Sequence, residues 1–257
     1  MAARVVSMLT TPVKALRVIE RSELELRAGG VEEDRRFFLI DAAGRMINGK
    51  QIASLQAVVA DYAPAERTLA LSIPGQAPLR GVVEPGASVA VRFFSREVEG
   101  REVLGPWSEA LSAFAGQPLR LVEPAASGVD RGEDGTVSLV SSASLERLAA
   151  QGGIEQPIDA RRFRMLFRVD GTRAHEEDGW IGRRLRIGAA VIQPRGHVGR
   201  CAITQRDPET GETDLLTLKI LGEYRRDAET TEPLACGIFG VVLEPGRVRL
   251  GDPVELI

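Results

Sequence analysis

The chain has 257 residues, of which 44% are hydrophobic, 27% charged and 5% aromatic, and its 33 basic and 36 acidic side chains give a net charge of −3. This composition excludes disordered and collagen-like chains, and the length suffices for one large domain or two modest ones with real cores. The small negative charge excludes a basic field over the whole surface, so we expect no nucleic acid as a global partner.

Cysteine and histidine are scarce in this chain. The two cysteines, Cys201 and Cys236, provide neither a disulfide framework nor a Cys-x-x-Cys metal clamp, and the two histidines add too few ligands for a zinc site. The first apolar stretch is broken by Thr10, Thr11 and Lys14, unlike a secretory signal, and no uncharged apolar run approaches the roughly 18 residues of a membrane span. We therefore expect a cytoplasmic protein with no membrane partner.

Short apolar or alternating segments, each closed by Gly, Pro or Asp, follow one another in the first third of the chain. In Thr68–Ile73 the side chains Leu69, Leu71 and Ile73 alternate with smaller or polar ones, which is typical of a half-buried strand. By the same criteria strands are predicted at 4–9, 23–27, 35–41, 57–62, 68–73 and 88–94.

Helices are predicted at two places, followed by a return to strands. The first helix starts near Pro106 and stops at Gly116, and the second is capped by Ser142 or Ser144. An acidic, glycine-rich loop is expected at 127–135. Further strands are predicted at 164–170, 183–188, 190–194, 200–205, 214–220, 236–244 and 253–257. The fold class is therefore mainly β with a few helices, divided into a β-barrel-like domain at 1–118 and a second β-barrel domain at 119–257.

One segment comes close to a phosphate-binding loop. The glycine and lysine spacing from Gly44 to Lys50 matches that motif, but Gln51 stands where Ser or Thr is needed to reach a magnesium ion. Asp41–Gly44 and Asn48-Gly49 are instead typical of hairpin turns. We interpret the segment as two β-turns.

Arginine dominates the basic residues, since lysine occurs only at positions 14, 50 and 219. Cys201 lies between Arg195, Arg200 and Arg206, and cationic neighbours favour the reactive thiolate. A free cysteine on a strand is most often a small buried hydrophobe, so this alternative stays open for Cys201, and it is our interpretation of Cys236, which has no adjacent charge. Further cationic segments that are suited to bind phosphate surround Lys14, Arg35-Arg36 and Arg161-Arg162-x-Arg164.

The chain as a whole resembles the MOSC superfamily, the molybdenum-cofactor sulfurase C-terminal domain, preceded by a MOSC N-terminal β-barrel domain. The resemblance depends on the order and spacing of several blocks. These are PVKALR, GVEEDRRFFLIDAAGRMI, VSLVSSASLERL, RRFRMLFRVDG, EEDGWIGRRLRIG, RCAITQRDPETG, TLKILGEYR and FGVVLEPGRVRLGDPVEL.

This resemblance implies a pterin-bound molybdenum as the cofactor. Cys201 looks like the molybdenum-ligating cysteine, and Asp207, in the block that follows it, is assigned with Cys201 to catalysis. The cofactor contacts that the resemblance implies are Lys14, Arg35, Ser142, Arg164 and Arg200. The chain departs from the family's usual residues at Leu166, Val198 and Gln205, and the loss of polar cofactor contacts there would weaken cofactor binding or alter the ligand.

The resemblance also implies an activity, since some members of the family reduce N-oxygenated small molecules. The chain has no cysteine-rich ferredoxin segment, so the electrons would come from a separate iron–sulfur or haem protein and its reductase. The first hypothesis is therefore a molybdenum-dependent oxidoreductase. The alternatives are a sulfur-transfer or cofactor-carrier protein that uses a Cys201 persulfide, and a non-catalytic β-barrel interaction protein with a degenerate cofactor site.

Overall fold

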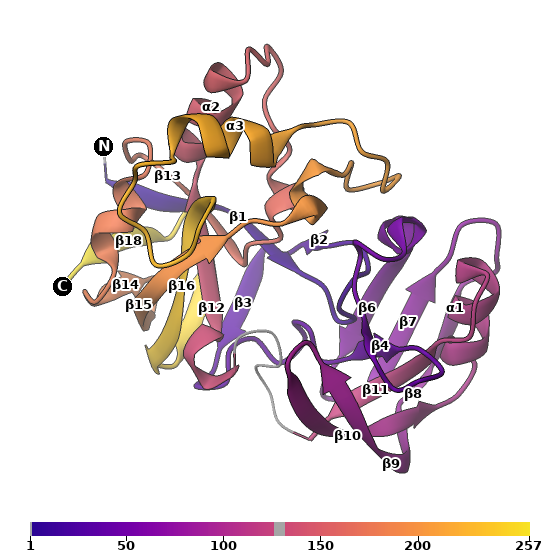
Figure 1. Ribbon diagram of the computed structural model, residues 1–257. Helices are drawn as coiled ribbons and strands as arrows, with labels where there is room; N and C mark the ends of the chain where they lie inside the picture. The colour runs from indigo at the N-terminus through magenta and orange to yellow at the C-terminus, as the bar shows by residue number, and fades with distance from the viewer. Residues whose placement is uncertain (1, 126–131) are drawn as a thin grey trace.

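The computed structural model describes residues 2–125 and 132–257, and Figure 1 shows two β-rich halves side by side. The predicted loop at 127–135 falls mostly outside these ranges, and its last residues, Gly132–Gly135, form the 3-10 helix η2. Among the described residues, no helix combines the length and the apolar character needed to span a bilayer.

The C-terminal half is built on a closed barrel of seven strands, which confirms the predicted mainly β class. Six of its strands come from the second half of the chain, and the first strand of the whole chain closes it by pairing with β13. In their order around the barrel the strands are β13 (Phe167–Asp170), β12 (Val137–Ser141), β16 (Ala235–Glu244), β15 (Ala190–Gly199), β14 (Leu185–Ile187), β18 (Pro253–Leu256) and β1 (Ala3–Thr10).

Strand β1 links the two halves of the protein. It runs antiparallel to β13, with Val5 opposite Val169 and Met8 opposite Phe167. All four of these side chains are buried in one cluster inside the barrel. Two short strands add to this connection. Strand β2 (Ile19–Glu20) pairs antiparallel with the end of β1, and β3 (Glu23–Leu26) pairs with β17 (Gly246–Arg249) of the C-terminal half. The boundary expected after residue 118 stays a prediction, and the first strand packs within the C-terminal barrel.

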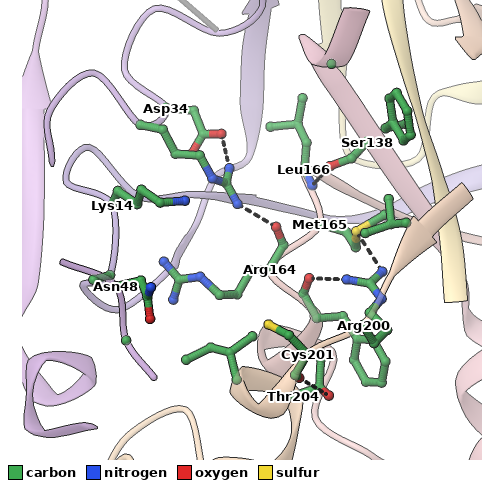
Figure 2. Close-up of a pocket in the computed structure, with 18 of the residues that line it drawn as sticks. Lys14, Asp34, Asn48, Ser138, Arg164, Met165, Leu166, Arg200, Cys201 and Thr204 are labelled. Carbon is green, nitrogen blue, oxygen red and sulfur yellow. Dashed lines mark hydrogen bonds and ion pairs between the residues drawn. The ribbon is translucent and has the colours of Figure 1, made fainter. Parts of the chain in front are cut away.

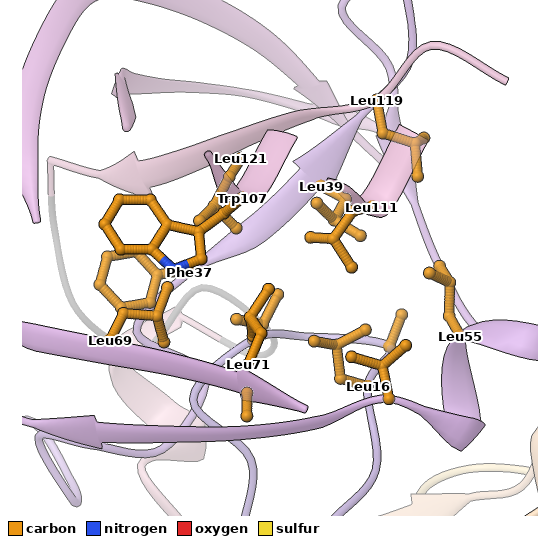
Figure 3. Close-up of a cluster of buried hydrophobic side chains, with 14 of the residues drawn as sticks. Leu16, Phe37, Leu39, Leu55, Leu69, Leu71, Trp107, Leu111, Leu119 and Leu121 are labelled. Carbon is orange, nitrogen blue, oxygen red and sulfur yellow. The ribbon is translucent and has the colours of Figure 1, made fainter. Parts of the chain in front are cut away.

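The N-terminal half consists of two sheets around its own core. Figure 3 shows Trp107 of α1 (Trp107–Ala115) packed with Phe37, Leu69 and Leu121. The five-stranded sheet contains β5 (Met46–Ile47), β4 (Phe38–Ile40), β11 (Arg120–Pro124), β10 (Arg96–Leu104) and β9 (Glu84–Phe93) in that order. The three-stranded sheet contains β6 (Val59–Ala63), β7 (Thr68–Ser72) and β8 (Leu79–Val82), and the 3-10 helix η1 (Ala53–Ala57) precedes it.

Both predicted helices are confirmed, with one change at a cap. Helix α1 ends at Gly116, whose φ of 68° is the left-handed conformation that glycine adopts without strain. Helix α2 (Ser142–Gln151) is capped by Ser141, whose hydroxyl accepts the backbone N–H of Ser144. The expectation that Ser142 or Ser144 is the cap was therefore wrong by one residue or more.

Two predicted strands are helical in the structure. The segment 214–220 was predicted as a strand, but α3 (Thr217–Tyr224) occupies most of it, because Thr217, Ile220 and Leu221 share one buried helical face. The strand predicted at 200–205 is the 3-10 helix η5 (Ala202–Gln205). The remaining 3-10 helices are η3 (Ala160–Phe163) and η4 (Glu176–Trp180).

The contribution of the β1–β13 pairing to stability can be tested at Phe167. It is fully buried and lies opposite Met8 of β1 and Leu139 of β12. We expect Phe167→Ala to lower the free energy of unfolding by about 3–5 kcal/mol, because it leaves a cavity where three strands meet. Chemical denaturation measures this loss. Val82→Ala is the control, since Val82 is 58% exposed, and we expect a change within about 0.5 kcal/mol. Equal losses in the two variants would contradict this account.

Candidate functional site

A cavity of about 460 Å³ lies between the two halves of the protein and is lined by both. Figure 2 shows Lys14, Asp34 and Asn48 from the N-terminal side facing Arg164 and Cys201 from the C-terminal side. Further polar side chains in the lining are Arg35, Lys50, Thr136, Ser138, Arg200 and Thr204. The site therefore exists only where the halves meet.

Most of the residues expected in the site come together here, although they are far apart in the sequence. Lys14, Arg35, Arg164, Arg200 and Cys201 all line the cavity. The departures Leu166 and Val198 line it as well. Ser142, Asp207 and Gln205 are not part of the lining, and the roles assigned to Ser142 and Asp207 stay predictions.

The cavity is strongly cationic although the chain is not. Its lining carries five basic side chains, and Asp34 is the acidic residue among them, which gives a formal charge of +4 against −3 for the whole chain. A concave wall of one sign concentrates the electrostatic field inside it. The cavity is therefore suited to an anionic ligand. The basic residues of the lining are Lys14, Arg35, Lys50, Arg164 and Arg200.

Two arginines connect the halves across the cavity. Nη2 of Arg35 donates to the backbone carbonyl of Arg164 over 2.7 Å, and Nη2 of Arg164 donates to the carbonyl of Leu16 over 2.8 Å. Arg35 also forms an ion pair with Asp34, whose Oδ1 accepts the backbone N–H of Thr11 over 2.8 Å. Each half therefore orients a cation of the other.

The backbone is strained at this site. Seven non-glycine residues among those described have a positive φ, and four of them line the cavity. Such a left-handed conformation costs of order 1–3 kcal/mol for a residue with a side chain, and it persists only where the surroundings hold it. The four residues are Ala15 (φ 83°), Arg35 (51°), Phe94 (55°) and Arg164 (54°). Both arginines were predicted to open strands, but they lie in turns before β4 and β13, where the strained backbone directs them into the cavity.

Cys201 carries an exposed thiol at the start of η5. Its backbone carbonyl accepts two hydrogen bonds from Thr204, one from the N–H and one from the hydroxyl, both over 3.1 Å. The Thr204 hydroxyl also lies 2.6 Å from that of Thr217 on α3, and both threonines are fully buried. The main chain of Cys201 is thus anchored to α3 while its sulfur stays accessible.

Arg200 uses its guanidinium group mainly within the protein. Nε donates to the carbonyl of Cys236 over 2.8 Å, and Nη1 donates to the carbonyl of Phe163 over 2.9 Å. The guanidinium carbon also lies 5.1 Å from the centre of the Phe163 ring. Arg200 therefore braces the segment that leads to Cys201 against the segment that leads to Arg164. Its predicted contact with a cofactor stays a prediction.

The structure gives Asp207 a turn-capping role. Its Oδ1 accepts the backbone N–H groups of Glu209 and Thr210 over 2.9 and 2.8 Å. Hydrogen bonding, first of all from the Thr210 backbone, lowers the pKa of this carboxyl below its ordinary value. The carboxylate is therefore held ionised within its own turn.

Several lining residues were missed by sequence reasoning, chiefly Asn48, Lys50, Phe94 and Ser138. Asp41–Gly44 closes the β4–β5 hairpin as predicted, with a bond from Gly44 N to Asp41 O. Asn48-Gly49 also forms a turn, with a bond from Gln51 N to Asn48 O, but the hairpin predicted there was wrong because this turn leads from β5 into η1. The glycine and lysine spacing of this segment, which resembles a phosphate-binding loop, was the available signal for Lys50. Ser138 lies within a predominantly apolar strand, so no sequence signal distinguishes it.

A buried carboxyl group supports the start of α2. Oε1 of Glu177 accepts the backbone N–H of Ser141 over 3.1 Å and the hydroxyl of Ser144 over 2.7 Å. Glu177 is fully buried, and its Oε2 has no hydrogen-bond partner among the described residues. Burial raises the pKa of this carboxyl above its ordinary value.

Comparison with known proteins identifies both halves of the chain. A family model described as the MOSC domain matches residues 126–255, and one described as the MOSC N-terminal beta barrel domain matches residues 2–118. Mitochondrial amidoxime-reducing component 1 of Mus musculus is 28% identical over 96% of this chain and 80% of its own length. Molybdenum cofactor sulfurase of Caenorhabditis elegans is 24% identical over 98% of this chain, which spans 35% of that relative. A crystal structure of the YUAD protein from Bacillus subtilis aligns over 100% of this chain and 96% of its own, with 14% identity and a TM-score of 0.47.

The buried Glu177 leads to a prediction about pH. Because its pKa is raised in the folded state, the unfolded chain releases this proton first as the pH rises above the ordinary value of 4.5, which lowers stability. Glu177→Gln keeps the Oε1 acceptor and removes the ionisation. Thermal unfolding measures the Tm of both proteins, and we expect the difference, Tm of the variant minus Tm of the unaltered protein, to increase as the pH is raised from 4.5 to 8.

Two histidines have a pKa lowered by burial, the half-buried His175 and the buried His197, and because both are present in the two proteins they do not interfere with this test. Burial lowers the pKa of His175 to about 4. Below pH 6.5, the ordinary pKa of histidine, the unfolded chain therefore binds this proton more readily than the folded protein, which destabilises the Glu177→Gln variant and the unaltered protein equally. A difference in Tm that stays constant over the whole pH range would contradict the assignment to Glu177.

Proposed function

The chain belongs to the MOSC family, with a MOSC N-terminal beta barrel domain ahead of its MOSC domain, and from this premise we propose that it is a molybdenum-cofactor-dependent oxidoreductase that reduces N-oxygenated compounds. The observation that carries the proposal is the exposed Cys201 thiol in a cationic cavity between the two halves. The relatives named for amidoxime reduction and for cofactor sulfuration support a role related to the molybdenum cofactor.

The residues of the cavity fit such a cofactor. Among residues 2–125 and 132–257, no group of three or more His, Cys, Asp or Glu side chains can hold a metal ion by itself. A metal that brings its other ligands with an anionic cofactor needs only one protein thiolate. Cys201 would supply that ligand at one wall, and the basic side chains offer charge complementarity to a phosphate group.

The half-buried cations of the lining are the candidates for binding the cofactor. Lys14, Arg35 and Arg164 are half-buried and converge on the cavity, so they would hold the anionic part of the cofactor. Ser138 lines the cavity, but its Oγ accepts the backbone N–H of Leu166 over 3.1 Å and thereby shapes the wall. When bound, the molybdenum cofactor supplies a metal that exchanges electrons with the substrate.

The remaining steps concern protons, electrons and access. Reduction of an N-hydroxylated group takes up two electrons and two protons, breaks the N–O bond and releases water. We propose that the substrate enters the same cavity with its N-oxygenated group directed toward the Cys201 side. We propose that a separate iron–sulfur or haem protein, with its reductase, delivers the electrons. The cytoplasmic location expected from the sequence stays a prediction.

Sulfur transfer is the second candidate, and one observation favours it. Cys201 is exposed in the same cationic surroundings that would stabilise a persulfide anion, and one group of relatives is named as sulfurases. Mass spectrometry of Cys201 after exposure to a cysteine desulfurase distinguishes this function. A persulfide on Cys201 would support it, and an unmodified thiol would count against it.

The metal content of purified protein tests the principal proposal. We expect protein from a host that makes the cofactor to contain about one molybdenum per chain, and we expect Cys201→Ser to lose most of it, because an alcohol is a poorer ligand than a thiolate for a soft metal site. Reduction of an amidoxime with an artificial electron donor should fall at least about a hundredfold in this variant. Elemental analysis and the reduction assay provide the two measurements.

Cys236→Ala is the matched control for this experiment. Cys236 is fully buried in a hydrophobic cluster, and burial raises the pKa of its thiol to about 12. We expect this variant to keep its molybdenum. Equal metal content in the Cys201→Ser protein would refute the ligand assignment, and a colourless, metal-free unaltered protein would favour the non-catalytic interaction barrel.

A further inference from the structure

Two loops of the N-terminal half form one edge of the cavity. Asn48–Lys50 follow strand β5, and Phe94 follows strand β9. Arg45 and Arg92 form a parallel bridge just before these loops, so the two segments leave their strands side by side and in the same direction. We call Asn48, Gly49, Lys50 and Phe94 the rim.

Lys50 is the exposed cation of the rim. The half-buried cations Lys14, Arg35 and Arg164 lie deeper in the lining, whereas Lys50 is open to solvent. Of the interactions among the described residues, none pairs the Lys50 side chain with a carboxylate. Its charge is therefore available to a ligand that enters the cavity.

The turn that carries Lys50 is held in place from both halves. The backbone N–H of Lys50 donates to Oδ1 of Asn48 over 3.0 Å, and the backbone carbonyl of Lys50 accepts a hydrogen bond from Nη2 of Arg206 over 3.3 Å. Gly49 packs so closely on Ile203 that an added Cβ would lie 2.8 Å from its Cδ1. Ile203 belongs to η5, which Cys201 precedes, so the rim is positioned directly against the loop of the thiol.

Phe94 supplies an aromatic surface beside this charge. Its side chain is 51% exposed although it lines the cavity, and its φ of 55° is a strained conformation for a residue with a side chain. Its ring makes an edge contact with Phe93 at 5.3 Å, and Nζ of Lys14 lies 5.5 Å from its centre. A strained and exposed aromatic residue at a cavity edge is a candidate for ligand contact.

We propose that the rim is a substrate-selecting subsite for planar N-oxygenated compounds that carry a carboxylate. The carboxylate binds at Lys50 and the planar group packs on Phe94, which leaves the N-oxygenated end directed toward the Cys201 side of the cavity. The assignment to reduction rests on the proposed function, but the binding preference does not. A cation beside an aromatic face recognises both parts of such a molecule.

Binding of a matched pair of unreactive compounds tests the subsite. Isothermal titration calorimetry with 4-carbamoylbenzoate and benzamide, whose amide ends are uncharged like an amidoxime, gives their ratio of dissociation constants on the molybdenum-loaded protein. We expect the carboxylate compound to bind about fivefold more tightly, as for one partly exposed ion pair. Lys50→Gln should abolish this preference, and Lys50→Glu should reverse it. Lys219→Gln removes the same charge from an exposed position on α3 and should leave the ratio unchanged.

A second variant tests the contribution of the Phe94 ring to binding. Phe94→Leu keeps an apolar side chain on the same backbone but removes the flat face, so we expect both compounds to bind about threefold more weakly, with an unchanged ratio. The corresponding amidoximes then show whether kcat/KM follows the same order. No preference in the unaltered protein, or the same preference in Lys50→Gln, would overturn the proposal.

Molybdenum content separates this inference from the proposed function. If Lys50→Gln loses molybdenum together with the binding preference, Lys50 belongs to the cofactor site and the subsite is refuted. If the unaltered protein reduces neither amidoxime yet binds the carboxylate compound more tightly through Lys50, the subsite is supported and the assigned reaction fails.

Discussion

The antiparallel pairing of β1 with β13 is the constraint on which the rest of the structure depends. It closes the seven-stranded barrel, and it also decides what lies at one end of that barrel. Because the strands are antiparallel, the residues that follow β1 lie beside those that precede β13, and the bond from Leu9 N to Leu166 O marks this point. Lys14 and Arg164 are thereby brought to one cavity from positions 150 residues apart in the chain.

The cavity combines features that are costly for folding and useful for binding. Cations from two domains are brought close together, and four residues of the lining keep a strained backbone. Hydrogen bonds between the halves, from Arg35 to the Arg164 carbonyl and from Arg164 to the Leu16 carbonyl, offset part of this cost. An anionic ligand would relieve the mutual repulsion of the cations, so ligand binding and association of the halves are expected to support each other.

The cavity residues serve different purposes. Cys201 presents an exposed sulfur on an anchored main chain, whereas Arg200 supports the walls through backbone carbonyls. In the two proposals, the half-buried cations hold the cofactor and the exposed Lys50 binds the substrate carboxylate. A cavity can thus concentrate positive charge in a protein of small net negative charge without a basic surface.

Local patterns determined much of the fold. Alternating apolar residues marked most strands, and the glycine at 116 ended α1 as predicted. The strand predicted at 214–220 failed, because a short apolar run satisfies a strand and a helix equally until a partner surface chooses the buried face. The cap at Ser141 differed from expectation because Glu177, distant in sequence, binds that residue.

The sequence by itself determined the mainly β class, the scarcity of cysteine and the block order that resembles the MOSC family. The resemblance assigned Lys14, Arg35, Arg164 and Cys201 to one site, but only the tertiary structure showed that they share a cavity between the two halves. Lys14, Arg35, Arg164 and Cys201 meet because barrel closure places distant segments together, which is a long-range property that no local spacing encodes. Lys50 and Phe94 line the same cavity from loops of the N-terminal half, while backbone hydrogen bonds hold the Asp207 carboxylate in its own turn.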